Sequence, residues 1–406
     1  IVGGGISGLY TYYNLISSNQ KICLLEKNSY YGGRIYQQQE TYLSKQYSFP
    51  AGAARFNENH TNVIKLLKHF KLLDFRKDKK LSASMKFIDS KNKFSEYKHD
   101  NGFYYVDKVL KAAKNYSKTE LQSLTFKELS KQILTKKELN YMLVSSGNSG
   151  QLKNMNAYNA VYLFNNGIRP DLNYWLGKFN LIINKLVTFL NKNNGNIKLN
   201  SQVKSVCLNN TKDCYEVTVN NRILYTKKII FCLPKPALLK MNILKPIHCI
   251  LDRSVTCKSL CRTYAIFKDC DFIKNLKKKI VTNNHLRYII PIDPANGLIM
   301  ISYTDEIYTK YWNSIKNNQE KLKEKIVALI KETFNVKIEK PVKVFVCNWD
   351  CGVAYWNKNI KSEEVADFIL NPIENIYICG ENYSLNQSWV EGSLETANSV
   401  IKLLEC

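Results

Sequence analysis

The sequence lacks the features that would assign it to a membrane or metal-binding class. No uninterrupted apolar run in its 406 residues reaches the roughly eighteen residues that a helix needs to cross a bilayer. It has no Cys-x-x-Cys pair and no Cys/His spacing typical of a metal site, and its five histidines are scattered. Internal repeats and low-complexity tracts are also missing. We therefore expect a soluble globular protein without a metal centre.

Twelve cysteines would suggest a disulfide framework in a small secreted chain. Here several lie inside apolar, strand-like runs, where a free cysteine behaves as a small hydrophobic side chain: Cys23, Cys207, Cys232, Cys347 and Cys379. This usage favours a reducing intracellular compartment, the cytoplasm. The chain begins at Ile1, inside the first expected strand and without an initiator methionine. We therefore expect upstream residues, which leave room for a targeting segment.

A formal charge of +25 is unusual for an enzyme with a small substrate, and it would suit an acidic partner such as nucleic acid or an anionic surface. The excess is spread along the chain. Its two short lysine clusters, near Lys77 and Lys278, lack the interleaved aromatic residues of a nucleic-acid-binding module. A coding bias toward lysine and asparagine is the favoured explanation, with a weak acidic partner as the alternative. The sequence indicates no oligomeric state.

The most informative motif that is present stands at the start of the chain. Residues 1–8 read Ile-Val-Gly-Gly-Gly-Ile-Ser-Gly, a G-x-G-x-x-G turn that opens a predicted helix. Gly3 allows the tight turn, Gly5 lets the backbone approach a pyrophosphate, and Gly8 lets the helix pack closely against the strand. Free N–H groups at the helix start, where Ser7 lies, bind phosphate. The turn predicts a dinucleotide site.

An acidic residue and a second glycine pair follow the turn. Glu26 comes eighteen residues after Gly8, at the end of an apolar run, where the fingerprint needs an acceptor for a ribose hydroxyl. Six residues later stands Gly32-Gly33-Arg34. This arrangement resembles the start of the flavin-containing amine oxidases, which include monoamine, polyamine and L-amino-acid oxidases and bind FAD. The resemblance implies that Gly33 and Arg34 lie against the FAD diphosphate and the flavin. Taken alone, they would equally fit a turn followed by a surface arginine.

Two later segments resemble the same family. Gly380-Glu381 stands eight residues before Trp389-Val390, as in the closing FAD motif. The resemblance implies that Glu381 contacts the ribityl chain and that the helix starting near Val390 directs N–H groups at the flavin. In the strands between residues 197 and 234, Val203 matches the residue whose backbone meets the adenine.

The mode of FAD attachment also follows from the resemblance. Covalent members of the family hold FAD through a cysteine just before an aromatic residue, and here Ala354 occupies that place before Tyr355. The resemblance therefore implies non-covalent FAD. Cys351 lies three positions earlier and is expected to be a packed thiol.

The substrate side of the site is indicated by Gly52-Ala53-Ala54-Arg55. L-amino-acid oxidases of this family show G-x-M-R there, and their arginine binds the substrate carboxylate. Arg55 has the planar guanidinium needed to bind a carboxylate through two parallel bonds, and Gly52 and Ala53 are expected beside the cofactor. The alternative is that Arg55 pairs with an acid of the protein or with the FAD phosphates.

Tyr355 and Trp389 match the places where the family puts two aromatic rings around the substrate amine. Such a slot is desolvated, which favours the neutral amine and orients the reacting carbon toward flavin N5. Each residue taken alone would more often be a core aromatic.

One position departs from the family. A lysine usually lies behind the flavin, where it holds a water near N5 and assists the reaction with oxygen. Alignment on Arg-Thr-Tyr-Ala-Ile-Phe-Lys puts Arg262 there, and arginine stays charged and cannot relay a proton. The reaction with oxygen is therefore in question. Lys258 and Lys268 lie close enough in sequence for the alignment to slip.

The expected architecture is α/β, with an FAD-binding Rossmann-like domain of the glutathione-reductase type and a second, α+β substrate domain. We expect a discontinuous FAD-binding domain from residues 1–60, 191–255 and 340–406. Residues 61–190 and 256–339 would form the substrate domain with a helical insertion. The segment 71–171 matches no motif and is expected to shape substrate entry.

These features together predict an FAD-dependent oxidoreductase that acts on an amine or L-amino acid. Hydride would pass to flavin N5, and oxygen would reoxidise the flavin and yield hydrogen peroxide. Tyr355, Trp389 and Arg262 would line the reacting centre. One alternative is a flavoprotein with a structural or nucleic-acid-packaging role. Another is an oxidoreductase of the same fold that acts on a non-amine lipid.

Overall fold

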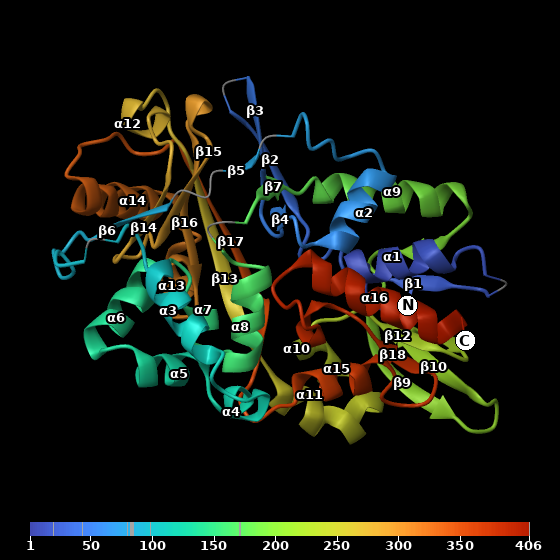
Figure 1. Cartoon of the computed structure of the whole chain (residues 1–406). Helices are drawn as coiled ribbons and strands as arrows, with labels where there is room; N and C mark the ends of the chain where they lie inside the picture. Colours follow the sequence, from blue (N-terminus) through green and yellow to red (C-terminus); the bar gives the residue numbers. More distant parts are fainter. Residues whose placement is uncertain are drawn as a thin grey trace.

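A computed structural model describes residues 1–18, 20–42, 44–78, 80–81, 85–97, 99–169 and 172–405. Figure 1 shows a Rossmann-like part on the right, which carries both labelled termini, and a second part on the left, built on a large sheet and a group of helices. This α/β architecture, with a second α+β part, is the fold class that the sequence predicts.

The Rossmann-like part joins strands from distant segments of the chain. β1 (Cys23–Leu25) pairs in parallel with β8 (Asn196–Lys198), and β12 (Ile229–Phe231) pairs in parallel with β18 (Ile376–Ile378). Val2 bridges the two pairs through Leu25 and Phe231. Short apolar strands of this kind are typical of a parallel sheet covered on both faces. Their carboxyl ends meet at one edge, which is where open α/β sheets bind ligands.

Three helices cover this sheet. α1 (Ile6–Leu15), α9 (Phe179–Lys192) and α16 (Val390–Glu405) share one buried cluster, to which they contribute Leu9, Leu186 and Leu394, among others. α9 is followed by a left-handed residue, because Asn194, two positions after Lys192, has a φ of 56°. An antiparallel meander of β9 (Val203–Asn209), β10 (Cys214–Val219) and β11 (Arg222–Thr226) lies beside the sheet.

The second part contains a six-stranded sheet in the order β17-β13-β16-β15-β14-β6. Its two longest strands, β13 (Val255–Ile266) and β17 (Lys343–Trp356), pair antiparallel along nearly their whole length. The sequence assigned residues from 340 onward to the nucleotide part, whereas β17 runs in this sheet. The other strands are β16 (Leu298–Asp305), β15 (Tyr288–Asp293), β14 (Lys279–Thr282) and β6 (Met85–Ile88).

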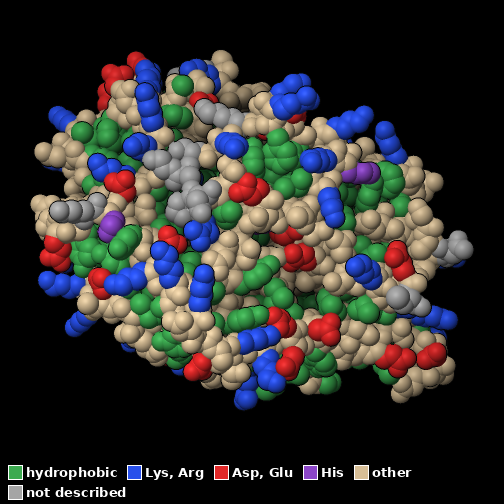
Figure 2. Space-filling view, in the orientation of Figure 1, with side chains coloured by type: hydrophobic (Ala, Val, Ile, Leu, Met, Phe, Trp, Pro, Cys, Tyr) green, Lys and Arg blue, Asp and Glu red, His purple; other side chains and the backbone are tan. Residues whose placement is uncertain are grey.

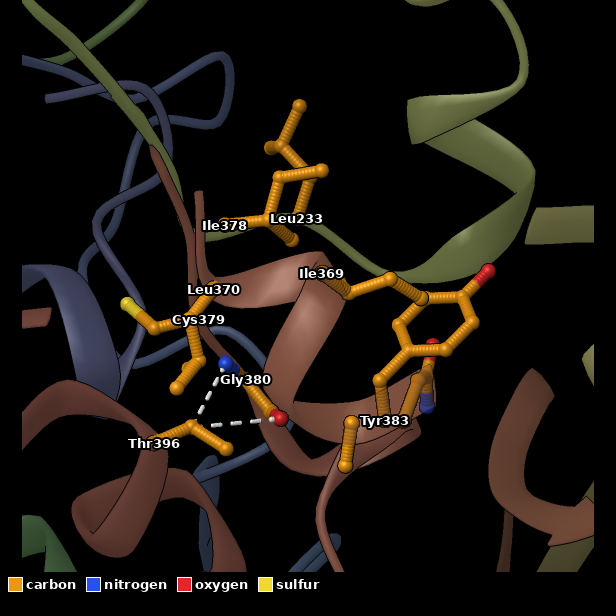
Figure 3. Close-up of a pocket in the computed structure, with 10 residues that line it drawn as sticks. Leu233, Ile369, Leu370, Ile378, Cys379, Gly380, Tyr383 and Thr396 are labelled. Atoms are coloured by element: carbon orange, nitrogen blue, oxygen red, sulfur yellow. Dashed lines mark hydrogen bonds between the residues drawn. The ribbon is translucent and has the colours of Figure 1, made fainter. Parts of the chain in front are cut away.

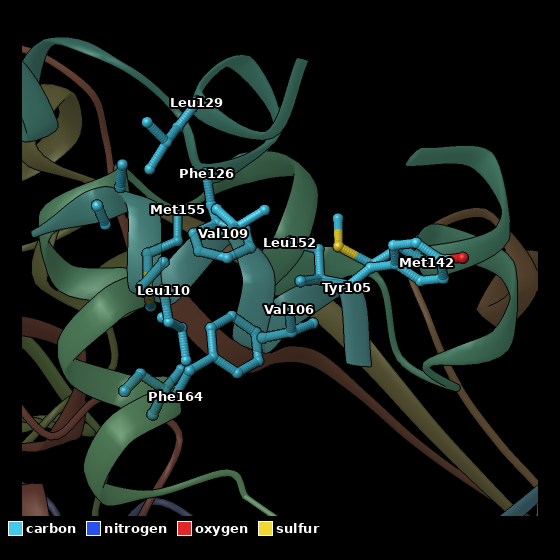
Figure 4. Close-up of a cluster of buried hydrophobic side chains, with 14 of the residues drawn as sticks. Tyr105, Val106, Val109, Leu110, Phe126, Leu129, Met142, Leu152, Met155 and Phe164 are labelled. Carbon is cyan, nitrogen blue, oxygen red and sulfur yellow. The ribbon is translucent and has the colours of Figure 1, made fainter. Parts of the chain in front are cut away.

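A layer of short helices forms most of the segment that matches no motif. Three of them begin with a capping box, in which Ser117, Thr125 and Thr135 each pair with the glutamate three residues later. Their apolar faces meet in a cluster with Phe126, shown in Figure 4. The helices are α3 (Phe103–Ala113), α4 (Lys118–Ser123), α5 (Phe126–Ile133), α6 (Lys136–Ser145), α7 (Gly150–Asn154) and α8 (Ala157–Asn166).

Several short strands in the first half of the chain have no clear sequence signal. The segment after β1 contains a hairpin, β2 (Gln37–Tyr42) and β3 (Lys45–Pro50), and then β4 (Arg55–Asn57). β4 pairs with β7 (Tyr174–Leu176), which also pairs with β5 (Lys80–Leu81). Arg55 is thus held on a strand rather than on a loop.

The chain contains further helices. α2 (Thr61–His69) has His60 at its N-cap position without a side-chain cap bond. The others are α10 (Lys235–Leu238), α11 (His248–Ser254), α12 (Asp271–Lys274), α13 (Ile307–Ile315), α14 (Gln319–Phe334) and α15 (Ser362–Leu370).

The surface shows no gathering of basic residues on the face in Figure 2, where Lys and Arg side chains are dispersed among Asp and Glu. Within the described residues, none of the helices combines the length and apolar character that a membrane crossing requires. The same residues contain no cluster of His, Cys, Asp and Glu that could hold a metal ion.

Candidate cofactor and substrate site

A cavity of about 710 Å³ lies where the two parts meet. Its size falls in the range of ligand-binding pockets, about 300–1,000 Å³. The wall is drawn from the whole chain: the first glycine turn, Glu26, the second glycine pair, Arg55, Val203, Arg262, residues 349–353, Tyr355 and the start of α16. The residues that the sequence motifs single out, scattered over nearly 400 positions, therefore surround one space.

The first glycine turn leaves room for a ligand at one position and none at another. A Cβ at Gly8 would lie 2.0 Å from the Gly3 carbonyl oxygen, so this close approach requires glycine. A Cβ at Gly5 would have no heavy atom within 4 Å and would project into open space. Gly5 is also the N-cap residue of α1 and has no side-chain cap bond. The helix start therefore offers free N–H groups to an anion in that space.

Glu26 is buried at the adenosine end of the expected site. Its carboxylate accepts hydrogen bonds from the backbone N–H groups of Gly4 at 2.7 Å and Asn28 at 2.8 Å. A carboxylate has about four lone-pair positions, so acceptors remain for ribose hydroxyls. Val203 lies in the same wall, next to Ser201 and Gln202.

Arg34 and Glu381 connect the two ends of the chain in this wall. The Arg34 Nη1 donates to Glu381 Oε2 at 2.8 Å, and more weakly to the carbonyls of Cys351 and Gly352 at 3.4 and 3.3 Å. The other Glu381 oxygen accepts the Ser388 N–H at 2.6 Å. Glu381 therefore fixes the loop that leads into α16.

The backbone of Gly380 is hydrogen-bonded to α16. Its φ of 147° favours glycine. Its N–H donates to Thr396 Oγ1 at 2.9 Å, and the same hydroxyl lies 3.3 Å from the Gly380 carbonyl, as Figure 3 shows. This arrangement sets the backbone of Gly380 and Glu381 at the cavity, where Val390 and Ser393 begin α16.

Gly52 and Ala53 bring a further backbone segment against the second glycine pair. The Ala53 N–H donates to the Arg34 carbonyl at 3.0 Å, and a Cβ at Gly52 would lie 1.8 Å from that oxygen. The second pair is itself tied to the first turn, because the Gly32 N–H donates to the Gly4 carbonyl at 2.8 Å. Gly33 has a φ of 58° and lines the cavity.

Arg55 projects from β4 into the other end of the cavity. Its guanidinium carbon lies 5.2 Å from the Tyr174 ring centroid and 5.8 Å from that of Trp389. Within the described part of the chain, no acidic residue forms an ion pair with Arg55. Lys279 is buried nearby, and desolvation together with the charge of Arg55 lowers its pKa to about 8. This end of the cavity therefore carries uncompensated positive charge.

The aromatic residues expected around a substrate line the same end. Tyr355 and Trp389 are both buried, and burial raises the pKa of the Tyr355 phenol well above its usual value, so this group stays neutral. His60 packs edge-on against Trp389, and burial lowers its pKa to about 3. Tyr355, Trp389 and His60 are thus uncharged at this end of the cavity.

Arg262 is the cation that the sequence predicts beside the flavin. Arg262 lines the cavity, whereas Lys258 and Lys268 are absent from the described wall. Its Nη1 donates to the Pro50 carbonyl at 3.2 Å, and its guanidinium carbon lies 5.0 Å from the Tyr303 ring centroid. The Nε atom is buried without a partner.

Several buried polar atoms of the wall have no hydrogen-bond partner among the described residues. These atoms are Arg262 Nε, Ser388 Oγ, Trp389 Nε1, Asn148 Oδ1 and Gln151 Oε1. Buried polar groups are normally hydrogen-bonded, so such a concentration is typical of a ligand site. The open position beside Gly5 and these unpaired groups both fit a large polar cofactor such as FAD.

Part of the wall has no recognisable motif in the sequence. The helical layer contributes Phe103, Ser146, Asn148, Gln151, Leu152, Phe164 and Ile168, and the large sheet contributes Leu260, Tyr288 and Tyr303. These residues lie on amphipathic helices, on strands, or in the short connections after α6 and α8, so no local pattern distinguishes them from other residues of the fold.

The cysteines differ from the expectation in two places. Cys351 forms a disulfide with Cys257 and is not a packed thiol. The antiparallel pairing of β13 with β17 brings the two residues together, which no local sequence pattern reveals. Cys207 is exposed, whereas Cys379 is buried and its sulfur lies 3.3 Å from that of Cys232.

Comparisons with known proteins agree with this architecture. The family model described as an NAD(P)-binding Rossmann-like domain matches residues 1–70. An uncharacterized protein of Acanthamoeba polyphaga mimivirus is 20% identical over 475 aligned residues, which cover 99% of this chain and 92% of the viral protein.

A solved structure with a similar fold is that of a putrescine oxidase double mutant, described as a structure-based redesign of cofactor binding. It matches with a TM-score of 0.77 and 14% identity over 100% of this chain and 98% of its own. The chain therefore has the fold of putrescine oxidase along its whole length. The predicted fold class is confirmed, and the resemblance to the flavin-containing amine oxidases is supported.

Proposed function

We propose that the protein is an FAD-dependent oxidoreductase that oxidises a small amine substrate bearing a carboxylate, such as an L-amino acid. The observation that carries this proposal is the position of Arg55. It stands without an acidic partner among the described residues, between aromatic rings, in the same cavity as the dinucleotide turn. The half-buried guanidinium has N–H groups that match a carboxylate, and a substrate carboxylate would bind it through two parallel hydrogen bonds.

The cofactor would lie along the motifs in the cavity wall, in the order that the family resemblance implies. Gly3, Gly5, Ser7 and Gly8 would hold the diphosphate, Glu26 the ribose, and Val203 the adenine. Gly33, Arg34, Gly52, Ala53, Gly380, Glu381 and Val390 would surround the flavin half. Ala354 is fully buried and has no nucleophile, which supports non-covalent binding.

When bound, FAD supplies the oxidant, accepting a hydride at N5 from the carbon that carries the amine. Arg55 would bind the carboxylate and so fix that carbon in front of the ring. Tyr355 and Trp389 would exclude water, which favours the neutral amine with its free lone pair. Hydrolysis of the imine would follow. Oxygen would reoxidise the cofactor and yield hydrogen peroxide, with Arg262 behind the ring.

We also propose a division of the chain that follows these roles. Residues 1–60, 191–255 and 357–406 would form the FAD-binding domain. Residues 61–190 and 256–356 would form the substrate domain, because β17 belongs to the large sheet. The helical segment within 71–171 would shape substrate entry, since it contributes to the cavity wall.

Anaerobic titration of the purified yellow protein tests the proposal. The panel pairs each L-amino acid with the amine that lacks its carboxylate, such as L-ornithine with putrescine. We expect the flavin absorbance to bleach with an amino acid and to change far less with its matched amine. Bleaching by amines alone would contradict the role of Arg55, and a protein that stays colourless after reconstitution with FAD would contradict the function as a whole.

A further inference from the structure

The Cys257–Cys351 disulfide lies in the wall of the cofactor cavity. Cys351 belongs to the stretch 349–353, each residue of which lines the cavity. Cys257 lies on the neighbouring strand, opposite Ala354 in the β13–β17 ladder. The bond therefore crosses between two strands directly beside the space that the cofactor would fill.

A local irregularity brings Cys351 to this position. The ladder pairs Lys258 with Val353 and then Leu260 with Trp349, so β17 has extra residues at this point. Bulges of this kind re-aim side chains and are common next to active sites. Here the bulge contains Cys351.

The surroundings of the disulfide are the residues of the expected FAD motifs. Arg34 donates to the Cys351 carbonyl at 3.4 Å and pairs with Glu381 at 2.8 Å. Asn382 Oδ1 lies 3.7 Å from the Cys351 sulfur and 4.0 Å from the Cys257 sulfur. The side chain of Asn382 also donates to Glu381 at 2.7 Å. The disulfide thus contacts the segment that would hold the flavin half of the cofactor.

We propose that the Cys257–Cys351 disulfide is a redox centre that accepts two electrons from the reduced flavin. The sulfur–sulfur bond breaks, and reduced FAD supplies two electrons and two protons. The products are oxidised FAD and the thiols of Cys257 and Cys351. A disulfide is a two-electron couple, so the stoichiometry balances without a further reactant.

Two observations favour this role over a purely structural crosslink. Arg262 lines the cavity at the position where the family resemblance implies an oxygen-assisting lysine. Because arginine cannot relay a proton, this substitution favours an electron acceptor other than oxygen. In addition, the cysteine usage favours a compartment in which thiols are kept reduced, and disulfides that occur there are usually catalytic or redox-sensing.

The inference depends on the proposed function only in requiring bound FAD, so its test uses a chemical reductant and no substrate. The holoprotein is reduced anaerobically with measured amounts of dithionite while the flavin absorbance is recorded. We expect uptake of about four electrons per flavin rather than about two. With a limiting amount of reductant, the bleached flavin should regain colour without oxygen as the disulfide is reduced.

Alkylation and peptide mapping of the reduced protein provide a second readout. Two new thiols should appear, at Cys257 and Cys351. The double variant Cys257→Ser/Cys351→Ser should take up only about two electrons and show no recovery of colour. The matched control Cys379→Ser removes one thiol of the close unbonded pair and should still take up about four.

Uptake of about two electrons by the wild type, with the Cys257–Cys351 bond intact after full bleaching, would overturn the inference. The wild-type thiol map decides the question even where the double variant fails to fold. A protein that binds no FAD would contradict the proposed function instead, and the two failures are therefore distinguishable.

Discussion

The guanidinium carbon of Arg55 lies 5.8 Å from the centre of the Trp389 ring, although the two residues are separated by most of the chain. Arg55 lies on β4, and Trp389 lies in the loop directly before α16. A cation held against an aromatic face keeps its direction while its N–H groups stay available. The pair therefore joins a cation to an aromatic wall of the cavity.

Replacing Arg55 tests this arrangement through ligand binding. Charge-assisted hydrogen bonds contribute about 1.5–3 kcal/mol each, so Arg55→Met should weaken binding of a carboxylate such as benzoate by roughly 100-fold or more. The measurement is a titration of the flavin spectrum. Arg55→Lys keeps the charge but loses the two-bond geometry. We therefore expect this variant to bind the carboxylate only slightly more tightly than Arg55→Met does.

Benzylamine provides the matched ligand without a carboxylate. Its affinity should change by less than about threefold in either variant, since it lacks the group that Arg55 binds. An equal loss for both ligands would show that the substitution disturbs the pocket rather than the recognition of the carboxylate.

Substitutions at Gly5 and Gly8 should distinguish an effect on cofactor binding from an effect on folding. A methyl group at Gly5 meets no protein atom within 4 Å but occupies the expected place of the diphosphate. Gly5→Ala should therefore leave the unfolding transition of the apoprotein nearly unchanged while weakening FAD binding by about tenfold or more. Fluorescence titration with FAD and thermal unfolding of the apoprotein measure the two effects.

Gly8→Ala is the contrasting variant. Its Cβ would lie 2.0 Å from the Gly3 carbonyl oxygen, so the helix must shift to accommodate it. We expect a loss of about 1–3 kcal/mol of stability in the absence of FAD. Equal stability losses in both variants would contradict the assignment of the space beside Gly5 to a ligand.

Sequence reasoning identified one side of the site and missed the other for a physical reason. Glycines that a turn requires, and an acid at a fixed distance, constrain the backbone locally, so Gly3, Gly8 and Glu26 can be recognised from spacing. The helical wall has no such constraint. Asn148 and Gln151 follow from packing of the helical layer against the sheet, which spacing does not encode.

Local sequence patterns also could not predict pairings between distant segments of the chain. The disulfide joins residues 94 positions apart because two strands pair, and strand order is a tertiary property. The position of β17 in the large sheet, rather than in the nucleotide part, has the same origin. By contrast, the helix that the sequence predicts from near Val390 lies within one segment, and α16 confirms it.

Glu391 caps α2 from the far end of the chain. Its carboxylate accepts the backbone N–H groups of Asn62 and Val63, both at 2.9 Å, although α2 lies more than 300 residues earlier. Glu391→Ala should reduce the free energy of unfolding by about 2–4 kcal/mol, because buried helix N–H groups lose a charged acceptor. Denaturant unfolding measures the loss. Glu391→Gln keeps an acceptor oxygen and should lose less; an unchanged midpoint for the alanine variant would contradict the capping role.

Glu395, one turn further along α16, gives stability a pH dependence. Burial and the neighbouring charge of Glu391 raise its pKa from 4.5 to about 6. The folded state therefore binds the proton more tightly than the unfolded state. The stabilising contribution is full below pH 4.5 and is lost as the pH rises through 6. Above that range the ionised group costs about 1–2 kcal/mol relative to a neutral one.

Glu395→Gln removes this ionisation and keeps the oxygen that accepts the Asn386 side-chain N–H. We expect the variant to match the wild type in unfolding free energy near pH 4.5 and to exceed it by about 1–2 kcal/mol at pH 8. Denaturant unfolding curves at both pH values measure the difference. A gain of the same size at both pH values would show that the substitution acts through packing, because only the ionised carboxylate carries the cost.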